Sequence, residues 1–488
     1  MPRRWEFAID IDRLAAVPPF AQITRRLAED IRRGRLRPGE RLPGSRRLAS
    51  TVGVHRNTVI AAYSELLAEG WVEAVHGRGT FVAAAIPDGL VRPLARGVSA
   101  RRTGPRTVLQ LTDVPRAYRP PALPRGTLNL SSGAPDLRLV PARQIGRAYR
   151  RILAHHAGDV LGYGDPEGHP GLRSALASML AATRGLSATS ASVLVTRGSQ
   201  MALTLLARAL LRPGDVVAVE GWGYRPAWEA FRAAGATVVP VAIDRDGIDV
   251  NTLRELSGRP RLRAVYLTPH HQYPTTVTLK AARRIEVLTL ARERTFAVIE
   301  DDYDHEFHYD SRPVLPLASV DDAGVVIYVG TLSKVLAPGL RLGYIVASPA
   351  VVGCVAAIRS VLDIQGDLAT EAAIASMIED GEVQRHIARV RRTYADRRAT
   401  LATTLRRALG TLVDFDLPAG GMALWLRFDR GVDVDAWARR SLSQGVSWFT
   451  GRRYAFDQQP CPFARLSFAS LNEREIVQAV KVMAATRR

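Results

Sequence analysis

The chain has 488 residues, too many for one ordinary domain, and its 47% hydrophobic and 23% charged content is typical of a globular protein. Its two cysteines, Cys354 and Cys461, exclude a disulfide framework, and we expect no signal peptide, no membrane-spanning segment and a cytoplasmic location. Residues 1–127 hold 22 Arg against 11 Asp and Glu, which supplies +11 of the net charge of +20. This asymmetry favours a nucleic acid as partner, although codon usage that favours arginine explains part of the excess.

Composition divides the chain into three parts. Residues 17–84 alternate helical apolar spacing with turn signals, and residues 85–127, with seven prolines and eight arginines, are predicted to be a linker. Residues 128–488 alternate apolar runs with amphipathic helices, which is typical of an α/β domain with a largely parallel sheet. The predicted strands are Val193–Thr196, Val216–Glu220, Thr237–Val241, Ala264–Thr268, Phe296–Glu300, Val325–Val329 and Gly343–Ala347.

The first part predicts a helix-turn-helix followed by a β-hairpin. An apolar stripe predicts a helix over residues 20–33, and Ser45 is expected to cap a short helix that ends at Gly53. A longer helix then opens at Arg56, the position of a recognition helix. Its buried face is predicted to hold Val59, Tyr63, Leu66 and Leu67. Residues 70–82 predict a hairpin with Arg78 at its tip, a wing suited to a minor groove or to phosphate.

This order of elements closely resembles the winged helix-turn-helix of GntR-type bacterial regulators over essentially all of residues 17–84. The resemblance implies binding to double-stranded DNA. The DNA contacts implied by matching positions are Arg46, Arg47, Arg56, Asn57, Thr58, Arg78 and Gly79. One departure is His55, where the family usually carries Ser, so we expect a poorly capped start of the recognition helix. The alternative is a small helical interaction domain with a solvated basic face.

Lys334 is one of only three lysines among 67 basic residues, so nearly every position that needs only positive charge carries Arg. A lysine amine can lose its proton and attack an aldehyde, whereas a guanidinium cannot. Lys334 follows an apolar run and the hydroxyls of Thr331 and Ser333, and Arg341 lies seven residues further on. This arrangement would suit an aldehyde cofactor that carries a phosphate. The alternative, a solvated surface lysine, is the reading we favour for the other two lysines.

Two further motifs point to the same chemistry. Gly198-Ser199-Gln200 lies between a predicted strand and a predicted helix, where backbone N–H groups bind phosphate. Asp301 ends a strand and Tyr303 follows it; a carboxylate can keep a pyridine nitrogen protonated, and a tyrosine can donate to a phenolic oxygen. A metal site in residues 301–308 is the weaker reading, because no second cluster has ligand spacing.

Together these segments resemble the fold-type I pyridoxal-phosphate enzymes of the aspartate aminotransferase superfamily over roughly residues 128–488. The resemblance implies an aldimine between the cofactor and Lys334, with Asp301 at the ring nitrogen and Tyr303 at the phenolic oxygen. The phosphate would be held by Gly198, Ser199, Gln200, Thr331, Ser333 and Arg341. It also implies that Tyr224 stacks on the ring, that Tyr163 reaches the phosphate from a second subunit, and that Arg465 binds an α-carboxylate.

The chain departs from aminotransferases at Tyr273, where they carry Asn, and at Thr276, where Gly is usual, which puts efficient transamination in doubt. A GntR-type module joined by a long linker to an aminotransferase-like domain is the layout of MocR-type regulators. We therefore expect a multidomain protein, a winged helix-turn-helix plus an α/β aminotransferase-like effector and dimerisation domain. The predicted function is a homodimeric transcription regulator that senses an amino compound or pyridoxal phosphate at Lys334; the alternative is an active aminotransferase with an added DNA-binding module.

Overall fold

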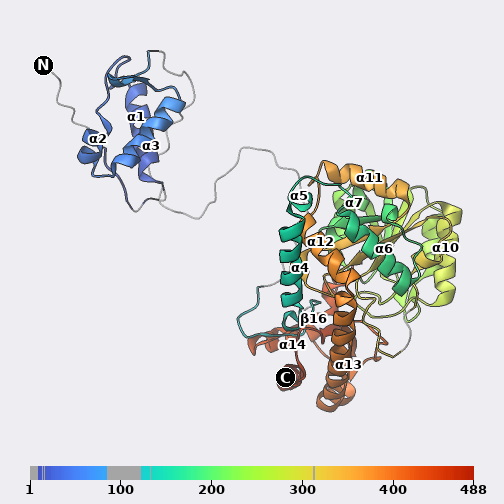
Figure 1. Ribbon diagram of the computed structural model, residues 1–488. Coiled ribbons are helices and arrows are strands. Elements are labelled where there is room, and N and C mark those ends of the chain that lie inside the picture. The colour runs from blue at the N-terminus through green and yellow to red at the C-terminus, as the bar shows by residue number, and fades with distance from the viewer. Residues whose placement is uncertain are drawn as a thin grey trace. The chain divides into compact units, whose positions relative to one another are not determined.

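The computed structural model describes residues 9–84 except 14 and 16, residues 122–310 except 132, and residues 314–487. These residues form two compact units, one on each side of residues 85–121, and each unit is described by itself (Figure 1). Most of the linker predicted over residues 85–127 lies outside the described residues. Among the helices of the described ranges, none has the length and apolar character needed to cross a bilayer.

The N-terminal unit is a three-helix core with a two-stranded wing. Its elements are α1 (Pro19–Arg32), α2 (Ser45–Val52), α3 (Arg56–Ala68), β1 (Val72–Val75) and β2 (Gly79–Val82). Ile23, Leu27, Leu48, Val59 and Leu66 are buried in one cluster that all three helices share. The two strands pair antiparallel, and the turn between them holds Arg78. The predicted helix-turn-helix with a wing is thereby confirmed.

Three local predictions in this unit were wrong. Ser45 is the first residue of α2 rather than its cap; Gly44 precedes the helix, and no side chain caps it. His55 does cap α3, because its Nδ1 accepts the backbone N–H of Asn57 at 3.3 Å, so the imidazole takes the place of the serine hydroxyl. Leu67 is exposed, because the buried stripe of α3 runs through Val59 and Leu66, and Leu67 lies about 100° further round the helix.

The C-terminal unit is built on a seven-stranded sheet in the order β4-β12-β11-β10-β9-β5-β6. In chain order its strands are β4 (Val193–Thr196), β5 (Val216–Glu220), β6 (Thr237–Val241), β9 (Leu262–Leu267), β10 (Ala297–Asp302), β11 (Val326–Thr331) and β12 (Gly343–Val346). All neighbours are parallel except β12, which runs antiparallel to β4 and β11. All seven predicted strands are confirmed, with ends shifted by at most two residues.

Helices cover both faces of this sheet, which explains why its strands are apolar on both sides. In β9, Ala264 and Tyr266 belong to the core under α7 (Ser199–Leu210), α8 (Arg225–Ala233) and α11 (Pro349–Ser360). The alternate residues Val265 and Leu267 belong to the core under α9 (Val250–Ser257) and α10 (Ala281–Arg294). A further bundle lies beside them (Figure 1), formed by α4 (Ala142–His155), α5 (Ala157–Val160), α6 (Pro170–Arg184) and α12 (Leu368–Glu379).

A smaller antiparallel sheet, which the sequence did not predict, completes the unit. Its order is β13 (Val413–Asp414), β14 (Ala423–Phe428), β17 (Phe463–Ser467) and β16 (Phe449–Thr450). It packs with α13 (Glu382–Leu409), α14 (Val434–Ser443) and α15 (Glu473–Ala485). Two short pairs are separate from it: β3 (Leu128–Asn129) with β15 (Val446–Ser447), and β7 (Ile243–Asp244) with β8 (Gly247–Ile248). The β3–β15 pair attaches the start of the unit to its C-terminal part.

Candidate cofactor and effector site

A cavity of about 380 Å³ brings most of the predicted site residues together. It lies where strands of the large sheet end, and residues 123–134 and the smaller sheet supply the rest of its wall. The predicted residues that line it are Ser199, Gln200, Tyr224, Asp301, Tyr303, Thr331, Ser333, Lys334, Arg341 and Arg465. Gly198 lies directly beside it. Tyr163 does not line it: this side chain is 89% exposed on the loop between α5 and α6.

Lys334 lies three residues beyond β11, with its amine in the cavity. Its Nζ donates a hydrogen bond to the carbonyl of Gly133 at 2.7 Å. Burial, together with the nearby guanidinium of Arg465, lowers the pKa of Lys334 to about 8. A substantial fraction of the amine is therefore neutral near physiological pH, which is the form that attacks a carbonyl. Gly133 was missed by sequence reasoning, because a backbone acceptor leaves no residue-type signal.

Asp301 is the last but one residue of β10, and its two oxygens have different surroundings. Oδ2 accepts the hydroxyl of Tyr266 at 2.7 Å, whereas Oδ1 is buried without a hydrogen-bond partner among the described residues. Burial raises the pKa of Asp301 to about 6. Leaving a buried acceptor without a hydrogen bond costs free energy. Oδ1 is therefore suited to accept a hydrogen bond from a donor on a ligand, such as a protonated ring nitrogen. Tyr266 was not predicted; its only signal was a lone tyrosine in an apolar strand.

The adjacent Asp302 faces a different set of groups. Its Oδ2 accepts the hydroxyl of Tyr328 at 2.6 Å and lies 3.0 Å from Nδ1 of His305. Burial acts to raise the pKa of Asp302, but His305 and Arg184 outweigh it and hold that pKa below its ordinary value. The charge of Asp302 is therefore paired with other groups of the protein, whereas Asp301 is the carboxylate that lines the cavity.

The start of α7 lines the cavity with groups that suit an anion. Gly198 precedes this helix with φ 79°, and no side chain of the described residues caps its first N–H groups. A Cβ atom at Gly198 would come within 2.9 Å of Nη2 of Arg341, so glycine lets the guanidinium approach the helix start. Thr331 and Ser333 line the same cavity, and the hydroxyl of Thr331 accepts the N–H of Ser333 at 3.1 Å. Helix N-terminus, hydroxyls and guanidinium together suit a phosphate.

Arg465 lies on β17 of the smaller sheet and is 2% exposed. Its guanidinium carbon is 5.0 Å from the ring centre of Tyr273, within cation–π range. Tyr273 also makes edge-on ring contacts with Tyr224 and Tyr303, with centres 5.8 Å apart in both pairs. The hydroxyl of Tyr303 donates to the carbonyl of His271 at 3.0 Å. Tyr273 therefore stands at the position where aminotransferases carry Asn, and its ring packs against the guanidinium of Arg465.

The loop that carries Tyr273 also contains the second departure from aminotransferases. Thr276 has φ 64°, in the left-handed region that favours glycine. A non-glycine residue there costs about 1–2 kcal/mol of backbone energy. Gln272 braces the loop by donating to the carbonyl of Trp222 and accepting from the hydroxyl of Thr275, each at 2.7 Å.

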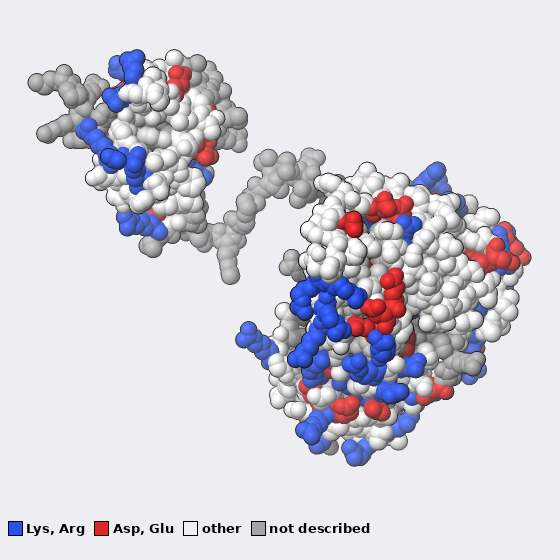
Figure 2. Space-filling view, viewed as in Figure 1, with Lys and Arg blue, Asp and Glu red and all other residues white. Residues whose placement is uncertain are grey.

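The candidate DNA-binding residues lie on the surface of the N-terminal unit. Arg56 and Asn57 open α3, Arg46 and Arg47 are on α2, and Arg78 is at the tip of the wing; all are exposed, and Thr58 is half-buried. Gly79 has φ 116°, and a Cβ there would approach Nε of Arg41 to 3.0 Å. Figure 2 shows more basic than acidic side chains on the visible face of this unit.

No group of three or more His, Cys, Asp or Glu side chains in the described part of the chain is arranged to hold a metal ion. In the segment from residue 301 to 308, the acidic and imidazole groups pair with protein partners instead. Asp304 contacts His271 at 2.8 Å, and Asp302 contacts His305.

Each of the two units matches a known protein family. Residues 19–82 match the family described as bacterial regulatory proteins, gntR family, and residues 125–483 match aminotransferase class I and II. The probable rhizopine catabolism regulatory protein MocR of Rhizobium meliloti is 33% identical over 96% of this chain and 94% of its own length. The HTH-type transcriptional regulator TauR of Rhodobacter capsulatus is 31% identical over 94% of both chains. The multiple substrate aminotransferase of Thermococcus profundus shares 28% identity and a TM-score of 0.69 over 75% of this chain and 92% of its own.

These matches define a transcription regulator in which a GntR-type winged helix is fused to a fold-type I aminotransferase domain. The chain belongs to the MocR-type regulators of the GntR family. Its winged helix implies DNA binding, and its aminotransferase fold implies dependence on pyridoxal phosphate.

We predict that protein stripped of cofactor reacts with added pyridoxal phosphate at a rate that rises with pH and levels off above pH about 8. Only the neutral amine attacks an aldehyde, and below its pKa the amine of Lys334 is protonated. An ordinary lysine would still gain reactivity up to pH about 10.4. The initial growth of the visible absorption band measures this rate. Arg465→Gln removes one cause of the lowered pKa and should move the plateau to higher pH; a wild-type rate still climbing at pH 10 would contradict the burial argument.

Proposed function

We propose that this regulator changes its DNA binding when an amino compound, or pyridoxal phosphate itself, occupies the site at Lys334. The observation that carries the proposal is that one cavity holds a lysine of lowered pKa, a buried arginine, and a carboxylate oxygen that has no hydrogen-bond partner among the described residues. A change in DNA affinity requires that the effector binds two arrangements of the protein with different affinities.

The residues of the cavity fit the cofactor that the fold implies. When bound, pyridoxal phosphate supplies an aldehyde for an amine and a ring that withdraws electrons. Lys334 would hold the aldehyde carbon through its neutral amine, and Asp301 would accept a hydrogen bond from the ring nitrogen. Tyr224 and Tyr303 would contact the ring. The phosphate would be held by Gly198, Ser199, Gln200, Thr331, Ser333 and Arg341.

Arg465 would bind the carboxylate of an amino-acid-like effector. The guanidinium of Arg465 lies near the amine of Lys334, because both groups approach Gly133. A Cβ atom added to Gly133 would lie 3.6 Å from Nζ of Lys334 and 4.0 Å from Nη1 of Arg465. A ligand with an amine and a carboxylate on one carbon can therefore reach both groups. A planar guanidinium binds a carboxylate through two parallel hydrogen bonds, which also fixes its orientation.

We also propose a homodimer formed through an exposed apolar surface. Leu161 and Tyr163 lie before α6, and Val361, Leu362 and Ile364 follow α11. These residues are 45–89% exposed, unlike the scattered apolar side chains of an ordinary monomer surface. The two segments lie side by side, because the side chain of Gln365 hydrogen-bonds to the backbone of both Gly162 and Gly164. In such a dimer Tyr163 would be available to the cavity of the partner subunit.

The first experiment is to record the visible absorption spectrum of the purified protein and to add a panel of amino acids. We expect a cofactor band in the wild type that Lys334→Ala abolishes, and a shift on effector binding that persists. A band that bleaches and returns with a keto acid would identify an active aminotransferase instead. Absence of any band after incubation with the cofactor would overturn the proposal, because the protein would not bind pyridoxal phosphate.

Arg56→Ala is expected to weaken specific DNA binding by about 1–3 kcal/mol, because Arg56 is exposed at the first position of the recognition helix. Full-length protein would be titrated against DNA fragments that the wild type selects from a randomised pool. The visible cofactor band should be unchanged. Arg212→Ala, at an exposed position in the other unit, is the matched control. Equal affinity of wild type and Arg56→Ala would exclude a contact from this position.

Val361→Glu is expected to convert the dimer to monomers, because it places a charge in the apolar surface where Val361 is 86% exposed. Sedimentation velocity of the full-length protein would give the mass of each form. Val320→Glu changes a valine that is 61% exposed elsewhere and should leave the assembly unchanged. A wild type that sediments as a monomer at all concentrations would refute the dimer.

A further inference from the structure

One wall of the cavity comes from the last residues of the predicted linker and from the residues that follow it. Residues 123–139, without residue 132, are called the arm here, and Leu123, Asn129, Ser131, Gly133 and Ala134 of the arm line the cavity. Leu123 is half-buried and lies five residues before β3. It is the lining residue closest in sequence to the DNA-binding unit.

The cavity has a cofactor side and an effector side. The groups assigned to the cofactor come from the large sheet and the start of α7. The arm and the smaller sheet supply the rest of the wall, and Arg465 and Phe449 are register partners on β17 and β16. Leu123, Met422 and Phe449 are apolar members of this wall. With Asp301, Lys334 and Arg341 assigned to the cofactor, Arg465 is the remaining charged side chain among the described lining residues.

The arm is fixed on the C-terminal side of Leu123. Leu128 and Leu130 donate backbone hydrogen bonds to the carbonyls of Gly445 and Ser447, both at 2.8 Å, and Leu130 is fully buried. These bonds hold β3 in place beside β15. The chain is therefore fixed from Leu128 onward, five residues after Leu123.

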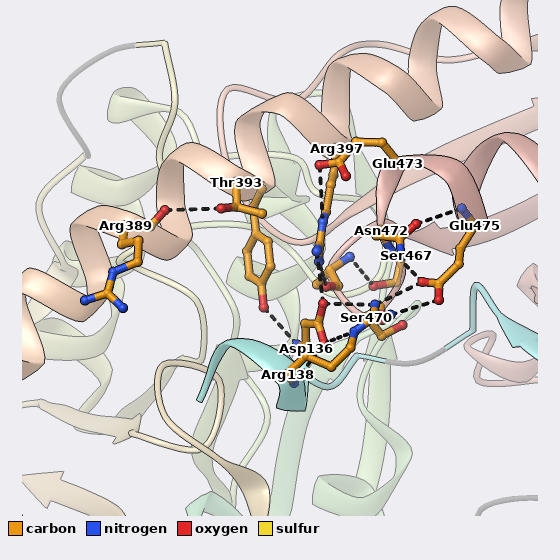
Figure 3. Close-up of polar contacts among 12 residues, drawn as sticks. Asp136, Arg138, Arg389, Thr393, Arg397, Ser467, Ser470, Asn472, Glu473 and Glu475 are labelled. Carbon is orange, nitrogen blue, oxygen red and sulfur yellow. Dashed lines mark hydrogen bonds and ion pairs between the residues drawn. The ribbon is translucent and has the colours of Figure 1, made fainter. Parts of the chain in front are cut away.

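A polar cluster fixes the far end of the arm. Figure 3 shows Asp136 and Arg138 pointing toward Arg397 of α13 and Glu475 of α15. Nη2 of Arg397 donates to Asp136 at 2.9 Å, and Arg138 donates to both oxygens of Glu475 at 2.8 and 2.9 Å. Asp136 is 4% exposed, so its charge depends on these partners.

We propose that Leu123 contacts the side chain of the effector, which is an amino acid with one carboxylate and an apolar side chain, and that this contact links the cavity to the linker. This inference rests on the proposed function. Arg465 takes the carboxylate, and the apolar wall favours an uncharged side chain because it offers no second charge to pair with one. The bound side chain contacts Leu123, five residues before the fixed strand β3, so occupancy changes the C-terminal end of the linker directly.

The test titrates full-length holoprotein with L-leucine, L-phenylalanine and L-aspartate, following the shift of the visible band. We expect tighter binding of the two apolar amino acids than of aspartate. Leu123→Ala should weaken their binding about tenfold, with the cofactor band of the free protein unchanged. This is less than the roughly sixtyfold expected for the loss of three fully buried carbon groups, because Leu123 is only half-buried. Leu123→Met should restore most of the affinity. Leu137→Ala, on the same arm but 66% exposed, is the matched control.

Hydrogen exchange tests the link to the linker. Amides of residues 122–127 should exchange more slowly when L-leucine saturates the wild type, and this protection should be lost in Leu123→Ala. Wild-type affinity in Leu123→Ala, or preference for aspartate, would overturn the inference while leaving the proposed function intact. A wild type without a cofactor band would overturn the proposed function and the inference with it. A cofactor band that none of a wider panel of amino acids shifts would overturn the inference and leave pyridoxal phosphate itself as the effector.

Discussion

The hydrogen bond between the amine of Lys334 and the carbonyl of Gly133 joins the two halves of the cavity wall. Lys334 follows β11 of the large sheet, whereas Gly133 belongs to the arm, which β3 and Arg397 attach to the C-terminal part of the unit. Lys334 is buried where these two halves of the wall meet, and this burial lowers its pKa. A lysine on an open sheet edge would keep its proton and its hydration, and would be a poor nucleophile at neutral pH.

The parts of the site that the sequence predicts are those encoded within short segments. Gly198 with the helix that follows it, Lys334 after its strand, and the wing around Arg78 each combine a local backbone shape with a distinctive residue type. Such segments fold in the same way wherever the surrounding layers allow it, so local signals suffice. The strands of the large sheet are equally predictable, because helices on both faces require continuous apolar runs.

The parts that the sequence does not predict depend on partners far apart in the chain. Asp136 meets Arg397 across 261 residues, and β3 pairs with β15 although each strand has only two residues. Tyr266 reaches Asp301 because their strands are neighbours in the sheet, which no local pattern reveals. His55 shows the converse error: residue statistics disfavour it as a cap, yet its Nδ1 meets the same backbone N–H group that a hydroxyl would.

The arrangement of the cavity suits a sensor because its two walls have different attachments. The wall assigned to the cofactor belongs to a large sheet buried between helices, and such a core does not deform continuously. The rest of the wall includes the arm, whose fixed region begins at β3, so Leu123 lies between this strand and the chain that leads to the DNA-binding unit. A ligand that fills the cavity contacts residues of both walls. A ligand that contacts Leu123 therefore acts on a chain segment that has a second folded unit at its other end.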